Sequence, residues 1–342
     1  MAVYLWQCLL VVLVVLSGSI GAVAEKITPI VVTAPVGDDS DDPAIWVHSK
    51  NPLKSLILGT DKGGRLFVYD LDGKVVATRE GMVRLNNVDV EYGVKLGDTL
   101  VDIAVVTDRG AEKVYIFRLP DLVLLDGGEG IRVFEGETER RVMGIGLYKR
   151  PKDGKTFVVL SRKSGPKDGY LWQYQLTEKD GYFDLQKVRV FGQWSGKAEI
   201  EAIAVDDELG YVYYSDETFG VRKYYADPDV ANSEQEVSVF GLTDFADDRE
   251  GISIFAGENG KGYILVSDQQ ADIFRVFSRT DDHIFLGTVM LSTKGSDGSD
   301  VVSVALGVKF PAGLFVAMSE ERTFHLYDWR EIESALAKHK KK

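Results

Sequence analysis

One strand–turn–strand pattern recurs six times along the chain and limits the folds that the chain can adopt. Each copy has an apolar strand, a polar turn and a second strand rich in aromatic residues. The copies are LILGTDKGGRLFVYDL from Leu56, DIAVVTDRGAEKVYIFRL from Asp102, FVVLSRKSGPKDGYLWQYQL from Phe157, YVYYSDETFGVRKYYAD from Tyr211, YILVSDQQADIFRVFSR from Tyr263 and LFVAMSEERTFHLYDW from Leu314. Successive copies start 46 to 55 residues apart, close to the ~40 to 50 residues of a four-stranded propeller blade. We therefore predict an all-β fold, a six-bladed β-propeller with four-stranded antiparallel blades around a central channel.

Another short strand precedes each pair, so every unit has a first, a second and a third strand in order. The six preceding strands read DDPAIWV, NNVDVEY, VMGIGLY, EIEAIAVDD, DREGISIF and SDVVSVAL. A propeller closes its ring by pairing an N-terminal strand with the last blade, and the strand-like residues 27–36 are placed to do so. Only residues 329–341 have a helical composition. We expect one domain rather than two.

The two ends of the chain carry signals of their own. Residues 1–24 have no charged side chain, include an apolar run at 9–16 and end in small residues at Ala22 and Ala24, which is typical of a secretory signal cut before Glu25. A membrane anchor is the alternative, but the apolar run is shorter than the ~20 residues of a span, so we expect no stable membrane insertion. The prediction is a signal peptide at 1–24, one propeller domain at 25–332 and a basic tail at 333–342 of a secreted protein, extracellular or periplasmic.

Cysteine use and charge exclude some functions. The single cysteine, Cys8, lies inside the predicted signal, so the mature chain would have no thiol for catalysis or for disulfides. The net charge of −13 argues against nucleic-acid binding, which needs a basic surface. An acidic surface either only keeps a protein soluble or gathers carboxylates that bind cations.

Acids and amides cluster where the first strand of each unit begins. In a propeller these strand entrances meet around one mouth of the channel. Oxygen donors from five of the six units suit Ca²⁺, which takes about six to eight oxygens. Solvated turn formers are the alternative, but carboxylates crowded at one mouth would repel one another unless a cation bound them. The entrance residues are Asp41, Asp42, Asn86, Asn87, Asp89, Met143, Glu199, Glu201, Asp248, Glu250, Asp297 and Asp300.

Positive side chains also recur in register. Lys62, Arg109 and Lys163 occupy the turn after the second strand in three consecutive units. If these turns face the acidic mouth, bound metal and fixed positive charge together could bind and polarise a phosphate. Ordinary hairpin lysines and arginines remain the alternative.

These residues resemble the β-propeller phytases, also called alkaline phytases, over about residues 27–329. The resemblance rests on DDPAIW at 41–46, NNVDV at 86–90, IEAIAVDDELG at 200–210, DREGI at 248–252 and LFVA at 314–317. It implies a 3-phytase type of hydrolase that uses several Ca²⁺ ions to remove phosphate from myo-inositol hexakisphosphate by direct attack of a metal-activated water. The absence of a usable cysteine, an RHG motif and a G-x-S-x-G elbow agrees with attack by water. Phytate or another inositol phosphate, bound as a calcium complex by a monomeric protein, would be the partner.

The resemblance also implies roles for particular residues. Asp41, Glu201, Glu217, Asp248, Glu250 and Gln269 would be calcium-site residues, with Asn86, Asp89, Asp297 and Asp300 as further or outer oxygens. Lys62, Arg109 and Lys163 would bind substrate phosphate. The residues expected to carry catalysis are Glu201, Asp248, Glu250, Lys62 and Arg109.

Four positions depart from the family pattern. Met143 stands where the family has a tyrosine that helps to hold the metals, and Ser164 stands in place of a glutamate. Gly63 replaces a lysine and Glu91 an arginine. Two other functions therefore stay open, a calcium-dependent propeller lactonase and a divergent, non-catalytic propeller that binds a phosphorylated ligand or a protein partner.

Overall fold

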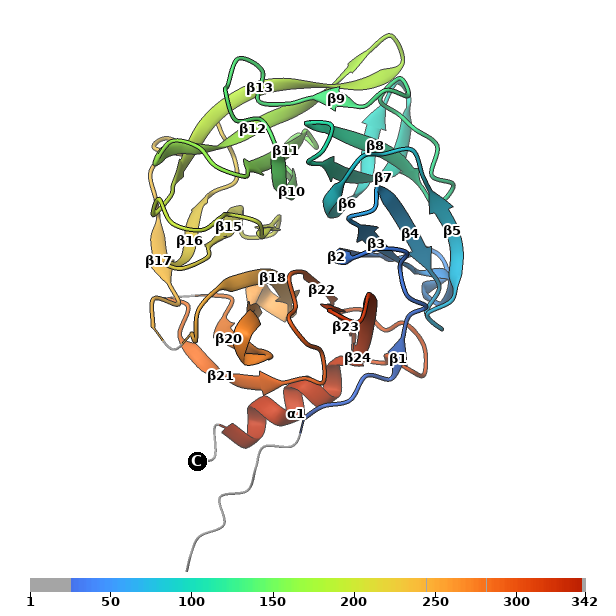
Figure 1. Ribbon diagram of the computed structural model, residues 1–342, viewed down its shortest axis with the longest axis vertical. Helices are drawn as coiled ribbons and strands as arrows, with labels where there is room; N and C mark the ends of the chain where they lie inside the picture. Colours follow the sequence, from blue (N-terminus) through green and yellow to red (C-terminus); the bar gives the residue numbers. More distant parts are fainter. Residues whose placement is uncertain (1–25, 244, 281, 340–342) are drawn as a thin grey trace, which may run out of the picture.

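Six sheets form a closed ring around a central channel in the computed structural model (Figure 1). The structure describes residues 26–243, 245–280 and 282–339, so the predicted signal at 1–24 lies outside the described residues. Every sheet has four antiparallel strands. This confirms the six-bladed propeller that the repeat spacing predicts.

In blades 1 to 5 the strands follow chain order from the channel outward. Blade 1 has β2 (Ser40–Trp46), β3 (Leu56–Asp61), β4 (Arg65–Tyr69) and β5 (Val75–Arg79). Blade 2 has β6 (Leu85–Leu96), β7 (Thr99–Asp108), β8 (Lys113–Leu119) and β9 (Ile131–Arg132). Blade 3 has β10 (Val142–Lys149), β11 (Thr156–Arg162), β12 (Asp168–Lys179) and β13 (Tyr182–Gln193).

The second half of the ring repeats this order. Blade 4 has β14 (Ile203–Asp206), β15 (Tyr211–Asp216), β16 (Gly220–Tyr225) and β17 (Ser238–Phe240). Blade 5 has β18 (Arg249–Ala256), β19 (Gly262–Asp268), β20 (Ile273–Ser278) and β21 (Phe285–Met290). Blade 6 has β22 (Ser299–Val302), β23 (Leu314–Ser319) and β24 (Thr323–Asp328), and its outer strand is β1 (Val31–Val32).

The pairing of β1 with β24 closes the ring. Val31 lies opposite Leu326 and Val32 opposite His325 in an antiparallel ladder. The backbone N–H of Thr33 extends the contact by donating to the carbonyl of Phe324 at 3.0 Å. The prediction that residues 27–36 close the ring is therefore confirmed.

The core lies between neighbouring blades. Because adjacent sheets cover both faces of each blade, the second strands are largely apolar, and every residue of β11 and of β23 is buried. In one cluster Ile103 and Val105 of blade 2 pack against Leu147 and Val158 of blade 3. This packing explains the continuous apolar runs in the six sequence copies.

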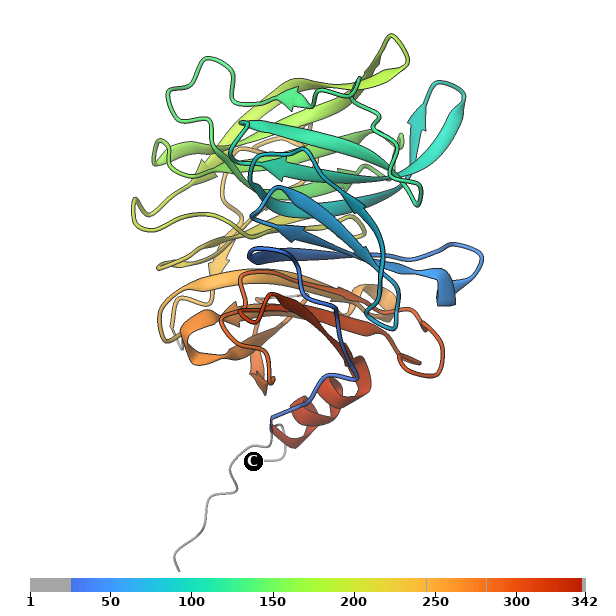
Figure 2. The same cartoon turned by 45° about the vertical axis from the view of Figure 1, so that its right-hand side comes forward.

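One α-helix, α1 (Trp329–His339), lies outside the ring and contacts β21 and β24 (Figures 1 and 2). Trp329, Ile332 and Leu336 are buried in the core cluster between blades 5 and 6, and the Trp329 ring stacks on Phe255 with 3.8 Å between centroids. The boundary drawn at residue 332 falls inside this helix. Three short 3-10 helices occupy connections at Pro52–Lys54 (η1), Glu258–Gly260 (η2) and Gln269–Ala271 (η3). None of the described helices is long and apolar enough to cross a membrane.

Candidate active site at the channel mouth

The same structural position in all six blades faces one mouth of the channel. It is the first residue after the second strand, at the end where the inner strand of the same blade begins. In chain order these residues are Lys62, Arg109, Lys163, Glu217, Gln269 and Glu320. Blades 1 to 3 therefore supply positive charge, and blades 4 to 6 supply carboxylate or amide oxygens.

Lys62 connects the first and last blades at this mouth. Its ammonium lies 2.9 Å from Oδ1 of Asp41, 3.2 Å from Oδ2 of Asp297 and 3.3 Å from Oδ2 of Asp39. Asp41 is 1% exposed, and this burial raises its pKa well above the ordinary value, with Lys62 opposing the rise. Burial lowers the pKa of Lys62, but the nearby carboxylates outweigh it and the net shift is upward. Lys62 therefore stays protonated beside these carboxyl groups.

Carboxylates crowd together on the opposite side of the mouth. Oxygens of Glu199, Glu201 and Glu217 all lie within 4.8 Å of one another. The side-chain amide of Asn86 donates to Oε1 of Glu201 at 2.5 Å. Burial, and then the charges of Glu201 and Glu199, raise the pKa of Glu217 to about 8. Glu250, from the next blade, is buried beside Glu217 and Glu201, and its pKa is raised well above the ordinary value, chiefly by burial.

Two predicted calcium-site residues complete the rim. The side-chain amide of Gln269 donates to the carboxylate of Asp297, so blade 5 is joined to the entrance of blade 6. Asp248 is partly buried, and Gln270 bonds it twice, donating to Oδ2 at 2.8 Å and accepting from its backbone N–H at 2.9 Å. Gln270 was not anticipated from the sequence.

The donor set fits a hard cation such as Ca²⁺. Three buried side-chain oxygens at the described mouth have neither a hydrogen bond nor an ion pair, Oδ2 of Asp41, Oδ1 of Asn86 and Oε2 of Glu250. Unpartnered buried oxygens and like charges both cost free energy, and a bound cation would relieve both. The ligand types are carboxylate and amide oxygens, which Ca²⁺ prefers.

Bulges in the inner strands aim these side chains. The pairing of β2, β6 and β18 with their neighbours shifts between Ser40 and Pro43, between Leu85 and Val88, and between Arg249 and Ile252. A bulge inserts an extra residue and turns its side chain out of the regular alternation. The first residues inside the three bulges, Asp41, Asn86 and Glu250, belong to the mouth, and the second residues, Asp42, Asn87 and Gly251, line the channel.

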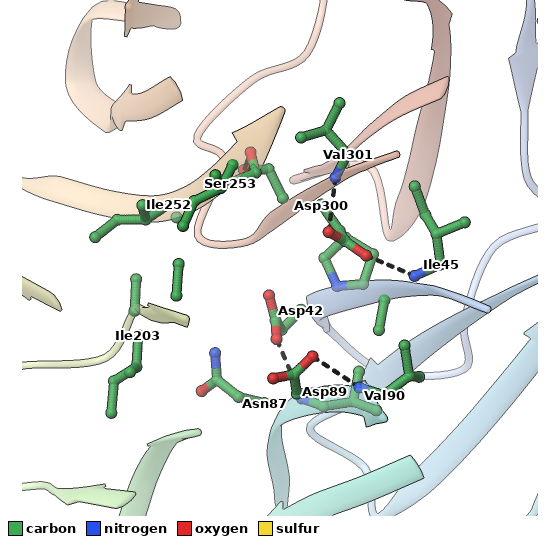
Figure 3. A pocket seen from close by; sticks show the side chains of 18 of the residues that line it. Asp42, Ile45, Asn87, Asp89, Val90, Ile203, Ile252, Ser253, Asp300 and Val301 are labelled. Atoms are coloured by element: carbon green, nitrogen blue, oxygen red, sulfur yellow. Dashed lines mark hydrogen bonds between the residues drawn. The ribbon is translucent and has the colours of Figure 1, made fainter. Parts of the chain in front are cut away.

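Asp89 and Asp300 do not join the mouth cluster. With Asp42 they line a channel cavity of about 230 Å³ deeper in the ring (Figure 3). Oδ2 of Asp300 accepts the Ile45 N–H at 2.7 Å, and Oδ2 of Asp89 accepts the Leu147 N–H at 2.7 Å. Each of these bonds joins one blade to the next, and burial raises the pKa of both carboxyls to about 7. The predicted metal ligands therefore fall into two groups. Most lie at the mouth, whereas Asp89 and Asp300 join neighbouring blades within the channel.

The other two predicted phosphate-binding cations also have protein partners. A guanidinium N–H of Arg109 donates to the sulfur of Met143 at 3.2 Å, and Met143 is fully buried. Lys163 pairs with the carboxylate of Glu199. A thioether is a weak acceptor, so Arg109 can exchange this contact for a phosphate oxygen at low cost.

The other departures from the family pattern lie beside or away from the mouth. Ser164 hydrogen bonds the carboxylate of Glu139 at the rim. Gly63 packs so closely that a Cβ there would lie 2.9 Å from Cβ of Asp38, which leaves no room for a lysine without a shift. Glu91 is buried next to Asp207, and burial raises its pKa to about 8. Its interactions are with channel residues rather than with the mouth.

Fold and site together define a six-bladed propeller whose channel mouth sets a buried carboxylate cluster beside fixed cations. A family model described as phytase matches residues 12–334. A 3-phytase of Bacillus subtilis (strain 168) is 31% identical over 338 residues, which cover 91% of this chain and 85% of that protein. The chain belongs to the phytase family.

A solved structure supports the fold alone. A luciferin-regenerating enzyme superposes with a TM-score of 0.55 over 87% of this chain and 95% of that chain. Its sequence identity is only 13%. The likeness therefore bears on the propeller and not on the chemistry of the mouth.

Proposed function

We propose that this phytase-family enzyme uses Ca²⁺ to release phosphate from myo-inositol hexakisphosphate or related inositol phosphates. The observation that carries the proposal is the polarised mouth, where Lys62, Arg109 and Lys163 face a cluster of buried carboxylates. The family membership and the 3-phytase relative support the substrate class. We expect the substrate as a calcium complex and the protein as a monomer.

The residues suited to hold calcium lie on both sides of Lys62. The mouth group is Asp41, Asn86, Glu201, Glu217, Asp248, Glu250, Gln269 and Asp297. Asp89 and Asp300 suit this role less well, because both oxygens of each accept backbone N–H groups. When bound, calcium would neutralise charge on phosphate oxygens and acidify water beside them.

The protein supplies the remaining chemistry through charge and position. Lys62 and Arg109 would bind phosphate oxygens and stabilise the negative charge that develops during in-line attack by water. Lys62 is well placed for this because the carboxylates around it keep it protonated. Glu201, Asp248 and Glu250 would orient the reacting groups, and the backbone contacts of the bulged strands fix where they point.

Export is a second part of the proposal. The uncharged, apolar residues 1–24 support secretion of the chain into the extracellular space or the periplasm. Free calcium is more abundant outside the cytoplasm of most cells, which suits an enzyme of this kind. Detection of mature protein beginning at Glu25 in the culture medium or periplasm would test this.

One observation favours the alternative of a non-catalytic propeller that binds a phosphorylated ligand. Met143 offers Arg109 a sulfur where an oxygen could have contributed to a metal site. The described contacts at this mouth do not support a lactonase, since such an enzyme would not need three cations beside the carboxylates.

Phosphate release from phytate distinguishes these functions. Release should require added calcium and stop with a chelator, and a wild-type protein without calcium-dependent release would refute the phytase proposal. Glu201→Gln should abolish turnover with the fold retained. The matched control is Glu258→Gln, an exposed residue of η2 whose loss should leave turnover unchanged.

A further inference from the structure

Glu199 stands at the mouth in a fixed position, although the resemblance gives it no role. Its backbone N–H donates to Oε2 of Glu217 at 2.9 Å, and the Glu217 N–H donates to its carbonyl at 3.3 Å. The preceding Ala198 has φ of 49°, a left-handed conformation that is unfavourable for a non-glycine residue. The chain thus enters blade 4 along a path that directs Glu199 toward Glu201 and Glu217.

The three glutamates form a group that lacks positive charge for its number of carboxylates. Their oxygens lie within 4.8 Å of one another, and the described ion pairs give this group one partner, Lys163 on Glu199. Two unpartnered buried oxygens belong to the same cluster. Oδ1 of Asn86 is on the amide that bonds Glu201, and Oε2 of Glu250 is on the carboxylate whose pKa is raised by burial and then by the charges of Glu217 and Glu201.

The partner of Glu199 is itself a candidate phosphate ligand. Lys163 is 34% exposed and the side chain of Glu199 is 24% exposed, so both can be reached from the mouth. As long as the pair is intact, the ammonium is occupied by a carboxylate of its own protein. A divalent cation would satisfy three carboxylates with two charges, where the lysine satisfies one carboxylate with one.

We propose that Glu199 is a further ligand of the cation at the mouth, and that cation binding takes it from Lys163 and frees this ammonium to bind phosphate. The proposal rests on the proposed calcium site and names a residue that couples it to substrate. At the entrance of blade 3, Met143 supplies a thioether and no oxygen. The neighbouring glutamates of blade 4 are then the oxygen donors on this side of the mouth. By linkage, phosphate that binds Lys163 would strengthen cation binding by the same factor.

Calcium titration by isothermal calorimetry tests the proposal without any turnover. Glu199→Gln should weaken calcium binding by about tenfold or more, since changing even an outer partner of a metal ligand costs roughly 10- to 100-fold. Glu320→Gln is the matched control, because it removes one exposed carboxylate at the same mouth, outside the three-glutamate group. Its effect on calcium affinity should be much smaller. Wild-type affinity in Glu199→Gln would overturn the assignment.

A double-mutant cycle tests the shared role of Glu199. Lys163→Met should tighten calcium binding in the wild-type background, because the ion pair no longer competes for the carboxylate. In the Glu199→Gln background the same change should have almost no effect, which gives a coupling energy between the two sites. Equal tightening in both backgrounds would mean that Lys163 acts only through its charge and would refute ligand exchange. Circular dichroism of all variants excludes loss of the fold as the cause.

Failure of this proposal is distinguishable from failure of the proposed function. Calcium-dependent phosphate release by the wild type, together with unchanged calcium affinity in Glu199→Gln, overturns the role of Glu199 alone. Calcium affinity that depends on Glu199 without phosphate release overturns the phytase activity alone and leaves the cation ligand in place.

Discussion

Replacing Asp300 by Asn should destabilise the protein at acid pH but not at alkaline pH. Asp300 is buried in the channel, where Oδ2 accepts the N–H of Ile45 in the neighbouring blade and Oδ1 accepts the N–H of Val301. An asparagine amide has one acceptor oxygen, so one of the two buried N–H groups loses its partner. That loss costs about 1 to 3 kcal/mol at any pH.

The opposing contribution depends on pH. Burial raises the pKa of Asp300 from 3.8 to about 7, and a shift of about three units corresponds to about 4 kcal/mol. Between these two pKa values the folded state holds a proton that the unfolded state has released, so the wild type loses stability as pH rises through the window. Asparagine does not titrate. Asp300→Asn should therefore be less stable than wild type at pH 4.5 and as stable or more stable at pH 8.5.

Urea unfolding at both pH values, with a chelator present, measures this difference. Asp89→Asn should behave in the same way, because Asp89 joins blades 2 and 3 and its pKa is also raised to about 7. Asp98→Asn, on an exposed hairpin, is the control. A free-energy difference between Asp300→Asn and wild type that is equal at the two pH values would refute the raised pKa.

Three further outcomes are expected. Calcium at 100 times its dissociation constant should stabilise the wild type by about 2.7 kcal/mol, which scanning calorimetry with and without chelator would show as a higher Tm; an unchanged Tm would contradict a cation site. Leu336→Ala in α1 should cost about 2 to 5 kcal/mol in urea unfolding, because Leu336 is buried against blades 5 and 6, whereas the exposed Ser334→Ala should cost little; equal costs would mean that the helix adds nothing to the core. Arg109→Gln should lower kcat for phytate by about 10²-fold or more, as loss of a charge-stabilising donor does, and near-normal kcat would remove Arg109 from the site.

The architecture was predictable because the blades repeat. The spacing of 46 to 55 residues predicts the blades, and the largely apolar second strands predict that each sheet is covered on both faces. Ring closure was predictable from the position of residues 27–36 alone. The end of the domain was harder to predict, because Leu336 packs into the core from within the segment that the sequence assigns to a basic tail.

The composition of the mouth was predictable in part. Lys62, Arg109 and Lys163 recur in register, and the structure extends that register to Glu217 and Gln269. Their partners were not predictable, because Lys62 meets Asp297 only after the ring has closed.

Asp41 and Asp42 show why the sequence did not predict which residues lie at the mouth and which line the channel. They are adjacent in a strand, and a bulge between Ser40 and Pro43 sends one to the mouth and the other to the channel. Neither residue type nor alternation marks that bulge. Glu199 had a usable signal, since it lies two residues before Glu201 and alternate residues of an extended chain share a face.

The contact between Lys62 and Asp297 bridges 235 residues and crosses the seam where the first and last blades meet. No chain that lacks the sixth blade can bring this ammonium and this carboxylate together, so this part of the mouth exists only in a closed ring. The mouth therefore holds the first and last blades together as well as binding substrate, and activity should require a closed ring. On heating, opening of the seam should end turnover before the six sheets lose their circular-dichroism signal.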